Sequence, residues 1–238
     1  MLVDLKKVSN IIFDFDGVIA ETDSARFELL STILEDYGIK LKNKYEPQDL
    51  VGSQTDTFLK NNFDFLSEED VKSIVEKRRR IYLENLDIFC RPYPQAIETI
   101  NDLKKAGYTL HLATTNDQHV VEELLKFLGL KKSFKTIFYR EKIVNVQTNN
   151  KDYGLFINES NLNSELVIVI EDSILGVKAA KNAKLSCIAF DIYNNIELKQ
   201  YADFIVGSYF ELRELFGLEV ITPQPLYGRG SQEKKLLP

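Results

Sequence analysis

The apolar positions of the chain fall into short runs that are separated by longer amphipathic stretches. Six apolar runs are of strand type, and they cover residues 10–15, 109–115, 135–139, 166–172, 186–191 and 203–206. Between them, apolar residues recur at helical spacing over residues 94–107, 117–129 and 173–183. Strands that alternate with helices predict a parallel sheet with helices on both faces. The expected fold class is therefore α/β.

A helical segment interrupts this alternation after the first strand. Apolar positions predict one helix over residues 24–38 and a longer one over residues 67–86. Ser67, followed three residues later by Asp70, resembles a capping box at the start of the longer helix. No strand pattern lies between the two helices. We therefore expect a small helical domain inserted into the α/β core.

These patterns divide the chain into three parts. The α/β core takes residues 1–20 and 88–220, and the inserted helical domain takes residues 21–87. Two prolines mark the return of the chain to the core and suit a connector. Residues 221–238 are polar with Pro and Gly, which predicts a loosely held C-terminal tail.

The amino-acid composition indicates which kinds of partner the protein is expected to bind. With 44% hydrophobic and 28% charged residues, the 238-residue chain has the composition of a soluble globular protein. The formal net charge of -6 argues against a nucleic-acid partner. No apolar run approaches the roughly 20 residues of a membrane span, and the N-terminus has no signal-peptide core. Two cysteines cannot form a disulfide framework. We expect a cytoplasmic protein, a monomer or weak dimer, without a membrane partner.

Polar side chains follow the first, second and fourth of the predicted strands. They are Asp14 and Asp16 after the first strand, Thr114, Thr115 and Asn116 after the second, and Glu171 and Asp172 after the fourth. Because ligands bind beyond the carboxyl ends of strands in an open parallel sheet, these residues should form one site. Close carboxylates repel each other, so a positive charge is expected among them. Gathered carboxylates are typical ligands of a hard dication, here Mg²⁺.

Three motifs in this order, DFDGV, ATTN and IEDS, resemble those of the haloacid dehalogenase superfamily of phosphohydrolases. With a helical insert directly after the first motif, the chain is similar to the branch that contains phosphoglycolate phosphatase and β-phosphoglucomutase. The resemblance covers nearly the whole chain to about residue 215. It implies a Rossmann-like core, a helical cap domain over residues 21–87, and a phosphoric monoester hydrolase.

The resemblance also implies a role for each matching residue. Asp14 corresponds to the nucleophile that attacks phosphorus and becomes an aspartyl phosphate. Asp16 corresponds to the acid that protonates the leaving oxygen and then activates water. Thr114 corresponds to the hydroxyl that holds a phosphoryl oxygen. The implied Mg²⁺ ligands are Asp14, Asp16 through its backbone carbonyl, Glu171 and Asp172.

Further residues are expected to bind substrate. Gly17 allows the chain to turn sharply away from the first strand. Thr115 and Asn116 follow the second strand, where Asn116 would assist in holding the phosphate. Gly52 and Ser53 lie between the predicted cap helices, and in the family such a loop reaches towards the active site and selects the substrate. A purely structural turn is an equally open interpretation of this loop.

A lysine completes the family's catalytic set, usually in a KPxP context. The best match is Lys151, in NNKDYGLF ahead of a helical pattern, although both prolines are missing. Lys142 is the alternative. A lysine ammonium here would offset the charge between Asp14 and the incoming phosphate. We expect Lys151 to have this role.

The expected activity is Mg²⁺-dependent hydrolysis of a small phosphorylated metabolite, a sugar phosphate or a phosphoglycolate-like compound. A phosphomutase of the β-phosphoglucomutase type is an alternative, but its cap loop resembles GVxR where this chain reads GSQT. The altered lysine segment leaves open a third interpretation, a binding or regulatory module that has lost turnover.

Three local features have structural explanations beside functional ones. The basic run from Lys77 to Arg80 is expected to be the solvated face of a cap helix, with attraction of an anionic substrate as the alternative. Asp117 is expected to cap the following helix. Glu171 and Asp172 could also be acidic residues favoured by a helix dipole.

Overall fold

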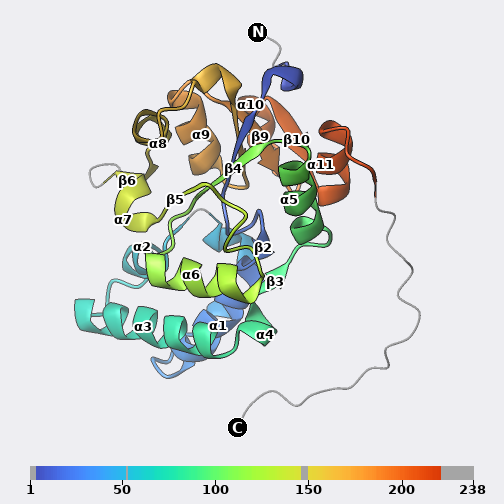
Figure 1. Cartoon of the computed structure of the whole chain (residues 1–238). Coiled ribbons are helices and arrows are strands. Elements are labelled where there is room, and N and C mark those ends of the chain that lie inside the picture. The colour runs from blue at the N-terminus through green and yellow to red at the C-terminus, as the bar shows by residue number, and fades with distance from the viewer. Residues whose placement is uncertain (1–3, 52, 146–149, 221–238) are drawn as a thin grey trace.

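A six-stranded parallel sheet forms the centre of the computed structural model, which describes residues 4–51, 53–145 and 150–220 (Figure 1). Its neighbouring strands follow the order β10-β9-β8-β1-β4-β5, and every pair is parallel. The strands are β1 (Asn10–Phe13), β4 (Thr109–Ala113), β5 (Thr136–Phe138), β8 (Val167–Glu171), β9 (Ser186–Phe190) and β10 (Phe204–Val206). Each lies within a predicted apolar run, so the expected α/β fold is confirmed.

The two faces of the sheet bury two different apolar clusters. Successive strand residues point to opposite faces, so Ile11 and Phe13 join one cluster while Ile12 joins the other. On the first face lie α5 (Ala96–Lys105), α6 (Gln118–Phe127) and α11 (Tyr209–Leu215). On the second lie α7 (Arg140–Ile143), α8 (Tyr153–Glu159), α9 (Ile174–Asn182) and α10 (Leu198–Tyr201). Burial on both faces explains why the strands are largely apolar.

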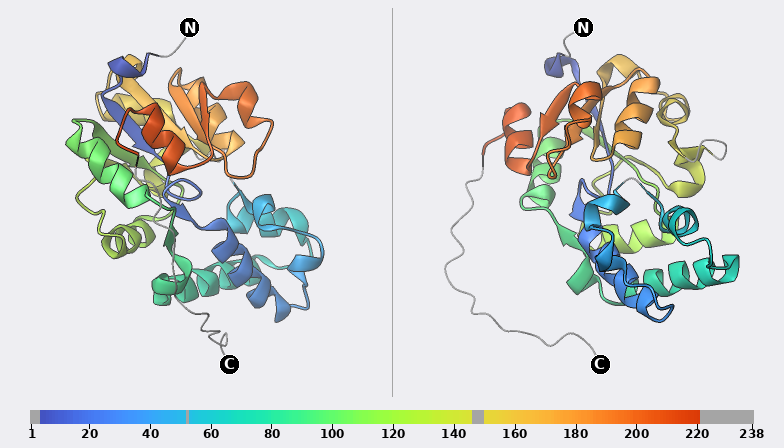
Figure 2. Two further views of the ribbon diagram at one scale, coloured as in Figure 1. Left: turned by 90° about the vertical axis from the view of Figure 1, so that its right-hand side faces the viewer. Right: turned by 180° about the vertical axis from the view of Figure 1, so that it is seen from behind.

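The inserted helices have an apolar cluster of their own. Its members include Leu30, Phe58 and Ile74, which come from three different helices. The helices are α1 (Asp23–Glu35), α2 (Thr55–Asn62), α3 (Glu68–Glu84) and the short α4 (Leu86–Phe89). Figures 1 and 2 show α1, α2 and α3 grouped beside one end of the sheet. The capping box of Ser67 and Asp70 is confirmed, whereas α2 was not predicted.

A short ribbon joins the inserted helices to the core. Strand β2 (Ala20–Glu21) pairs antiparallel with β3 (Arg91–Pro92), so the outgoing and returning segments of the chain lie side by side. Pro92 fits here because this two-stranded ribbon has free edges. The ribbon fixes where the helices sit relative to the strand ends.

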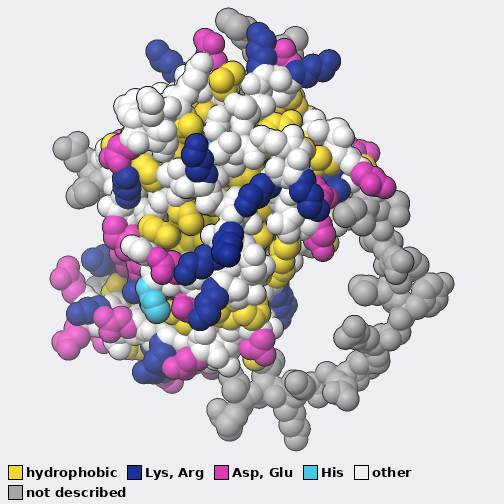
Figure 3. Space-filling view, viewed as in Figure 1, with side chains coloured by type: hydrophobic (Ala, Val, Ile, Leu, Met, Phe, Trp, Pro, Cys, Tyr) yellow, Lys and Arg dark blue, Asp and Glu magenta, His cyan; other side chains and the backbone are white. Residues whose placement is uncertain are grey.

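The remaining elements are short. They are η1 (Leu5–Lys7), η2 (Leu41–Asn43), η3 (Pro47–Leu50), η4 (Ser164–Leu166), β6 (Val144–Asn145) and β7 (Asn150–Lys151). Among the described residues, no helix combines the length and the apolar character that a transmembrane span requires. The face drawn in Figure 3 carries basic and acidic side chains together with small apolar areas.

Candidate active site

The carboxyl ends of two neighbouring strands bring the predicted acids together. Asp14 follows β1, Glu171 ends β8 and Asp172 follows it. Because β1 and β8 are paired, carboxylate oxygens of these three residues lie within 4.8 Å of one another. Asp14 and Glu171 are buried, at 7% and 0% exposure. The structure thus gathers three of the four predicted metal-binding residues through their carboxylates.

Lys151 lies against this acidic cluster. Its Nζ is 2.8 Å from Asp14 Oδ1 and 2.6 Å from Glu171 Oε1, and its side chain is only 6% exposed. Lys142 instead pairs with Glu159 and lies 4.0 Å from the ring centroid of Phe138. Of the two candidate lysines, Lys151 therefore occupies the position that the predicted role requires.

The cluster holds more negative than positive charge. Burial raises the pKa of Asp14; the Lys151 ammonium opposes this shift, and Glu171 adds to it. Burial also raises the pKa of Asp172, with Asp14 and Glu171 acting in the same direction. Burial alone would lower the pKa of Lys151, but the carboxylates of Asp14 and Glu171 raise it above its ordinary value. One ammonium among three carboxylates fits a site that takes a dication.

Local structure holds Lys151 in place without the expected prolines. Lys151 belongs to a two-stranded ribbon in which it pairs with Val144. The next residue, Asp152, caps α8 by accepting a hydrogen bond of 2.8 Å from the backbone N–H of Leu155. Strand pairing at the lysine and a helix cap after it fix the backbone that prolines would otherwise restrict.

Tyr153 is a site residue that sequence reasoning missed. Its hydroxyl donates a hydrogen bond of 2.6 Å to Glu171 Oε1, the same oxygen that contacts Lys151. The side chain is fully buried beneath the acidic cluster. A tyrosine at the start of an apolar helix carries no sequence signal for this contact.

The other predicted polar residues follow β4, and one of them contacts Asp16. Asn116 Nδ2 donates a hydrogen bond of 2.7 Å to Asp16 Oδ2 and so orients that carboxyl group. The backbone N–H of Asn116 donates to Thr114 Oγ1 at 3.2 Å, and Thr114 is fully buried. Thr115 lines a cavity of about 370 Å³ together with Asp14.

Gly17 allows the backbone to turn and also allows it to lie close to the carboxylate of Asp172. Its φ is +69°, in the left-handed region that favours glycine. A Cβ atom built at this position would lie 1.9 Å from Asp172 Oδ2. No side chain fits there, so the first strand-end loop packs directly against the carboxylate of Asp172.

The predicted substrate loop reaches the same cavity. Ser53 lines it together with Asp14 and Lys151, whereas Gly52 lies outside the described residues. Arg26 on α1 donates to the backbone carbonyl of Ser53 at 3.2 Å and also contacts the carbonyl of Leu50. Arg26, which sequence reasoning missed, therefore ties the loop to the helix beside the site.

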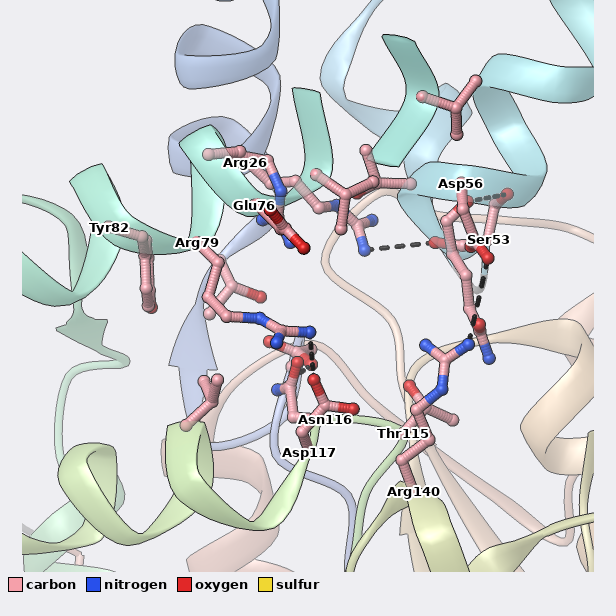
Figure 4. A pocket seen from close by; sticks show the side chains of 18 of the residues that line it. Arg26, Ser53, Asp56, Glu76, Arg79, Tyr82, Thr115, Asn116, Asp117 and Arg140 are labelled. Carbon is pink, nitrogen blue, oxygen red and sulfur yellow. Dashed lines mark hydrogen bonds and ion pairs between the residues drawn. The ribbon is translucent and has the colours of Figure 1, made fainter. Parts of the chain in front are cut away.

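The prediction that the basic run of α3 is solvated is wrong for Arg78, whereas the Arg79 side chain is 43% exposed. Both are half-buried and line a cavity between α3 and the core, because this helix packs over the strand ends. Lys77 pairs with Asp36 at 2.7 Å. Arg79 pairs with Asp117, as Figure 4 shows. Asp117 does occupy the N-cap position of α6, but its side chain makes no capping hydrogen bond.

Comparison with known proteins identifies the family. The model of the haloacid dehalogenase-like hydrolase family matches residues 11–190. A phosphorylated carbohydrates phosphatase from Thermotoga maritima is 29% identical over 183 residues, which are 75% of this chain and 82% of the relative. The pyrophosphatase PpaX of Bacillus cereus is 22% identical over 213 residues, covering 87% of this chain and 95% of the relative.

Solved structures share the fold. A crystal structure described as a predicted phosphoglycolate phosphatase from Haemophilus somnus matches with a TM-score of 0.74 at 18% identity, covering 88% of this chain and 98% of that chain. The β-phosphoglucomutase of Clostridium difficile matches with a TM-score of 0.70 at 22% identity, covering 88% and 97%.

Proposed function

The chain belongs to the haloacid dehalogenase-like hydrolase family, and we propose that it is a Mg²⁺-dependent phosphatase of a small phosphorylated metabolite. The observation that carries this proposal is the buried contact of Lys151 with Asp14 and Glu171 at the strand ends. A sugar phosphate or a phosphoglycolate-like compound is the proposed substrate class. The Thermotoga maritima relative, named as a phosphorylated carbohydrates phosphatase, supports it.

In the proposed first step, a carboxylate oxygen of Asp14 attacks the phosphorus atom of the ester. The bond between phosphorus and the leaving oxygen breaks, and Asp16 donates a proton to that oxygen. Asn116 holds the carboxyl group of Asp16 through its 2.7 Å hydrogen bond, so the acid is oriented before the substrate arrives. The product of this step is an aspartyl phosphate on Asp14 and a free alcohol.

In the second step, water attacks the phosphorus atom of the aspartyl phosphate. Asp16, now a carboxylate, accepts a proton from that water, and the bond to Asp14 breaks to release inorganic phosphate. Lys151 offsets negative charge beside Asp14 in both steps. Residues 21–87 are proposed to act as a cap that excludes bulk water from the cavity.

The acidic cluster fits a bound Mg²⁺. Asp14, Glu171 and Asp172 offer carboxylate oxygens within 4.8 Å of one another, and oxygen is the ligand that this ion prefers. When bound, Mg²⁺ would offset charge on the phosphoryl group and on the attacking carboxylate. The backbone carbonyl of Asp16 is the remaining proposed Mg²⁺ ligand.

Metal removal should abolish the activity. Without a dication, three clustered carboxylates would face an anionic phosphate with only one ammonium among them. EDTA should therefore stop phosphate release, and an excess of Mg²⁺ should restore it. Full activity in a preparation shown to be metal-free by elemental analysis contradicts this part of the proposal.

Tyr153→Phe should weaken the metal site. The substitution removes the hydroxyl that orients Glu171, and such supporting contacts typically contribute about 10- to 100-fold to metal affinity or activity. We expect the Mg²⁺ concentration for half-maximal activity to rise about tenfold or more. Tyr209→Phe is the matched control, because this buried tyrosine has a hydroxyl without a hydrogen-bond partner. An equal shift in both variants would mean that Tyr153 has no specific role.

A panel of phosphorylated metabolites assayed with Mg²⁺ tests the proposed function. Release of inorganic phosphate from sugar phosphates or phosphoglycolate supports it. Interconversion of sugar phosphate isomers without net phosphate release would identify a phosphomutase instead. Binding of phosphate esters without turnover of any of them would identify a binding or regulatory module.

A further inference from the structure

A second cavity adjoins the site and lies between α3 and the core. Its volume is about 430 Å³, within the range of small-molecule sites. Asp16, Ser53 and Thr115 line both this cavity and the one that contains Asp14 and Lys151. A ligand whose phosphate lies at Asp14 could therefore extend into the second cavity without leaving the protein.

Arg78 on α3 lines this second cavity without an ion-pair partner among the described residues. Its Nε is buried and has no hydrogen-bond partner, and its guanidinium forms no ion pair within the described part of the chain. Burial lowers its pKa to about 10, the nearby Arg26 adds to this shift and the charge of Asp16 opposes it, so Arg78 stays a cation at neutral pH. A buried charge without a partner is costly, and a second guanidinium nearby adds to the cost.

The other arginines of this cavity already have carboxylate partners. Arg79 pairs with Asp117, and Arg140 lies 4.0 Å from Asp56, so these arginines already join the inserted helices to the core (Figure 4). Arg26 pairs with Asp23 at 2.9 Å. Holding the inserted helices in place therefore does not require Arg78.

Other polar atoms in the same cavity also have no partner. Both amide atoms of the Gln54 side chain and Oγ1 of Thr55 are buried without a hydrogen bond. Buried polar atoms in folded proteins are nearly always paired. A guanidinium, an amide and a hydroxyl that line one cavity are suited to a carboxylate or phosphate group, whose oxygens can accept hydrogen bonds from all three.

We propose that Arg78 binds a second anionic group of the substrate, a phosphate or a carboxylate remote from the ester that is hydrolysed. The inference rests on the proposed phosphatase function and narrows its substrate class to phosphate esters with two anionic ends. Gln54 and Thr55 supply further hydrogen bonds to that second group.

Matched substrate pairs test the proposal. One pair is glucose 1,6-bisphosphate and glucose 6-phosphate, and the other is phosphoglycolate and ethyl phosphate. The wild-type enzyme should prefer the doubly anionic member of at least one pair, and that pair identifies the second group. In Arg78→Met, the preference, measured as a ratio of kcat/KM, should fall about 10- to 100-fold, mainly through KM.

Two further variants control for structural effects. Arg78→Lys keeps the charge without the planar fork, so it should retain an intermediate preference. Arg80→Met changes an exposed arginine on the same helix and should leave the preference unaltered. Thermal melts of all variants check that the fold persists. A proportional loss on both members of each pair would overturn the proposal, as would a wild-type enzyme that prefers neither doubly anionic compound.

The experiments also distinguish failure of this proposal from failure of the proposed phosphatase function. If the wild-type protein hydrolyses no ester, the phosphatase function fails, and calorimetric binding of the same compounds to wild type and Arg78→Met decides the present proposal. Weaker binding of the doubly anionic compound alone in Arg78→Met supports a binding role for Arg78. Equal binding by the two proteins overturns it.

Discussion

Asp14→Asn should abolish turnover and prevent any covalent phosphoenzyme. The amide cannot act as the nucleophile, and loss of such a residue costs on the order of 10⁴-fold or more in kcat. The fold should persist, because Asn is isosteric with Asp and Lys151 keeps its ion pair with Glu171. Phosphate release measured with excess Mg²⁺ gives the rate, and circular dichroism checks the fold.

Asp16→Asn provides the matched comparison, because it changes the acid and base but leaves the nucleophile. This variant should still bind metal and a phosphate analogue, since the proposed metal contact of this residue is its backbone carbonyl. It should turn over at least about 10²-fold more slowly than the wild-type enzyme. Near-normal turnover in Asp14→Asn would exclude the covalent mechanism.

Lys151→Ala should lower kcat/KM by about two to three orders of magnitude. The lysine is 6% exposed and contacts two carboxylates, so its removal leaves buried negative charge unpaired. Breaking one side of a buried ion pair typically costs about 3–5 kcal/mol, and the approaching phosphate would meet the same uncompensated charge. Steady-state kinetics on a folded preparation measures the loss.

Lys142→Ala is the control for this prediction. Lys142 lies 4.0 Å from the ring centroid of Phe138 and pairs with Glu159, and it makes no contact with the acidic cluster. Its substitution should change kcat/KM little. If Lys142→Ala were inactive and Lys151→Ala active, the catalytic role would belong to Lys142. Two active variants would mean that the site uses neither lysine in catalysis.

Much of the fold could be predicted because burial on two faces leaves a plain signal in the sequence. Strand β8 is apolar at nearly every position, as a strand covered by helices on both faces must be. The gathering of Asp14 and Glu171 followed from the same reasoning, since parallel strands end at one edge of a sheet. Helix α2 was missed because only Phe58 and Leu59 of its eight residues are buried apolar side chains.

The rest of the site depends on contacts that no local pattern encodes. Lys151 could be favoured over Lys142 by chain order, but its placement depends on strand pairing with Val144 and on the cap from Asp152. The position of Arg78 depends on how α3 lies over the strand ends, which is a tertiary property. A basic run on a helix has the same sequence whether it faces water or a cavity.

Chemical trapping of the phosphoenzyme tests the central claim most directly. The wild-type protein is mixed with Mg²⁺ and a phosphate ester that it hydrolyses, and the reaction is quenched in acid within one turnover time. Reduction with borohydride then converts an aspartyl phosphate to homoserine. Peptide mass spectrometry then locates the change. The proposed mechanism predicts homoserine at position 14 and at no other aspartate, with none in Asp14→Asn. Rapid hydrolysis with Asp14 unmodified, or with homoserine at another position, would contradict the mechanism.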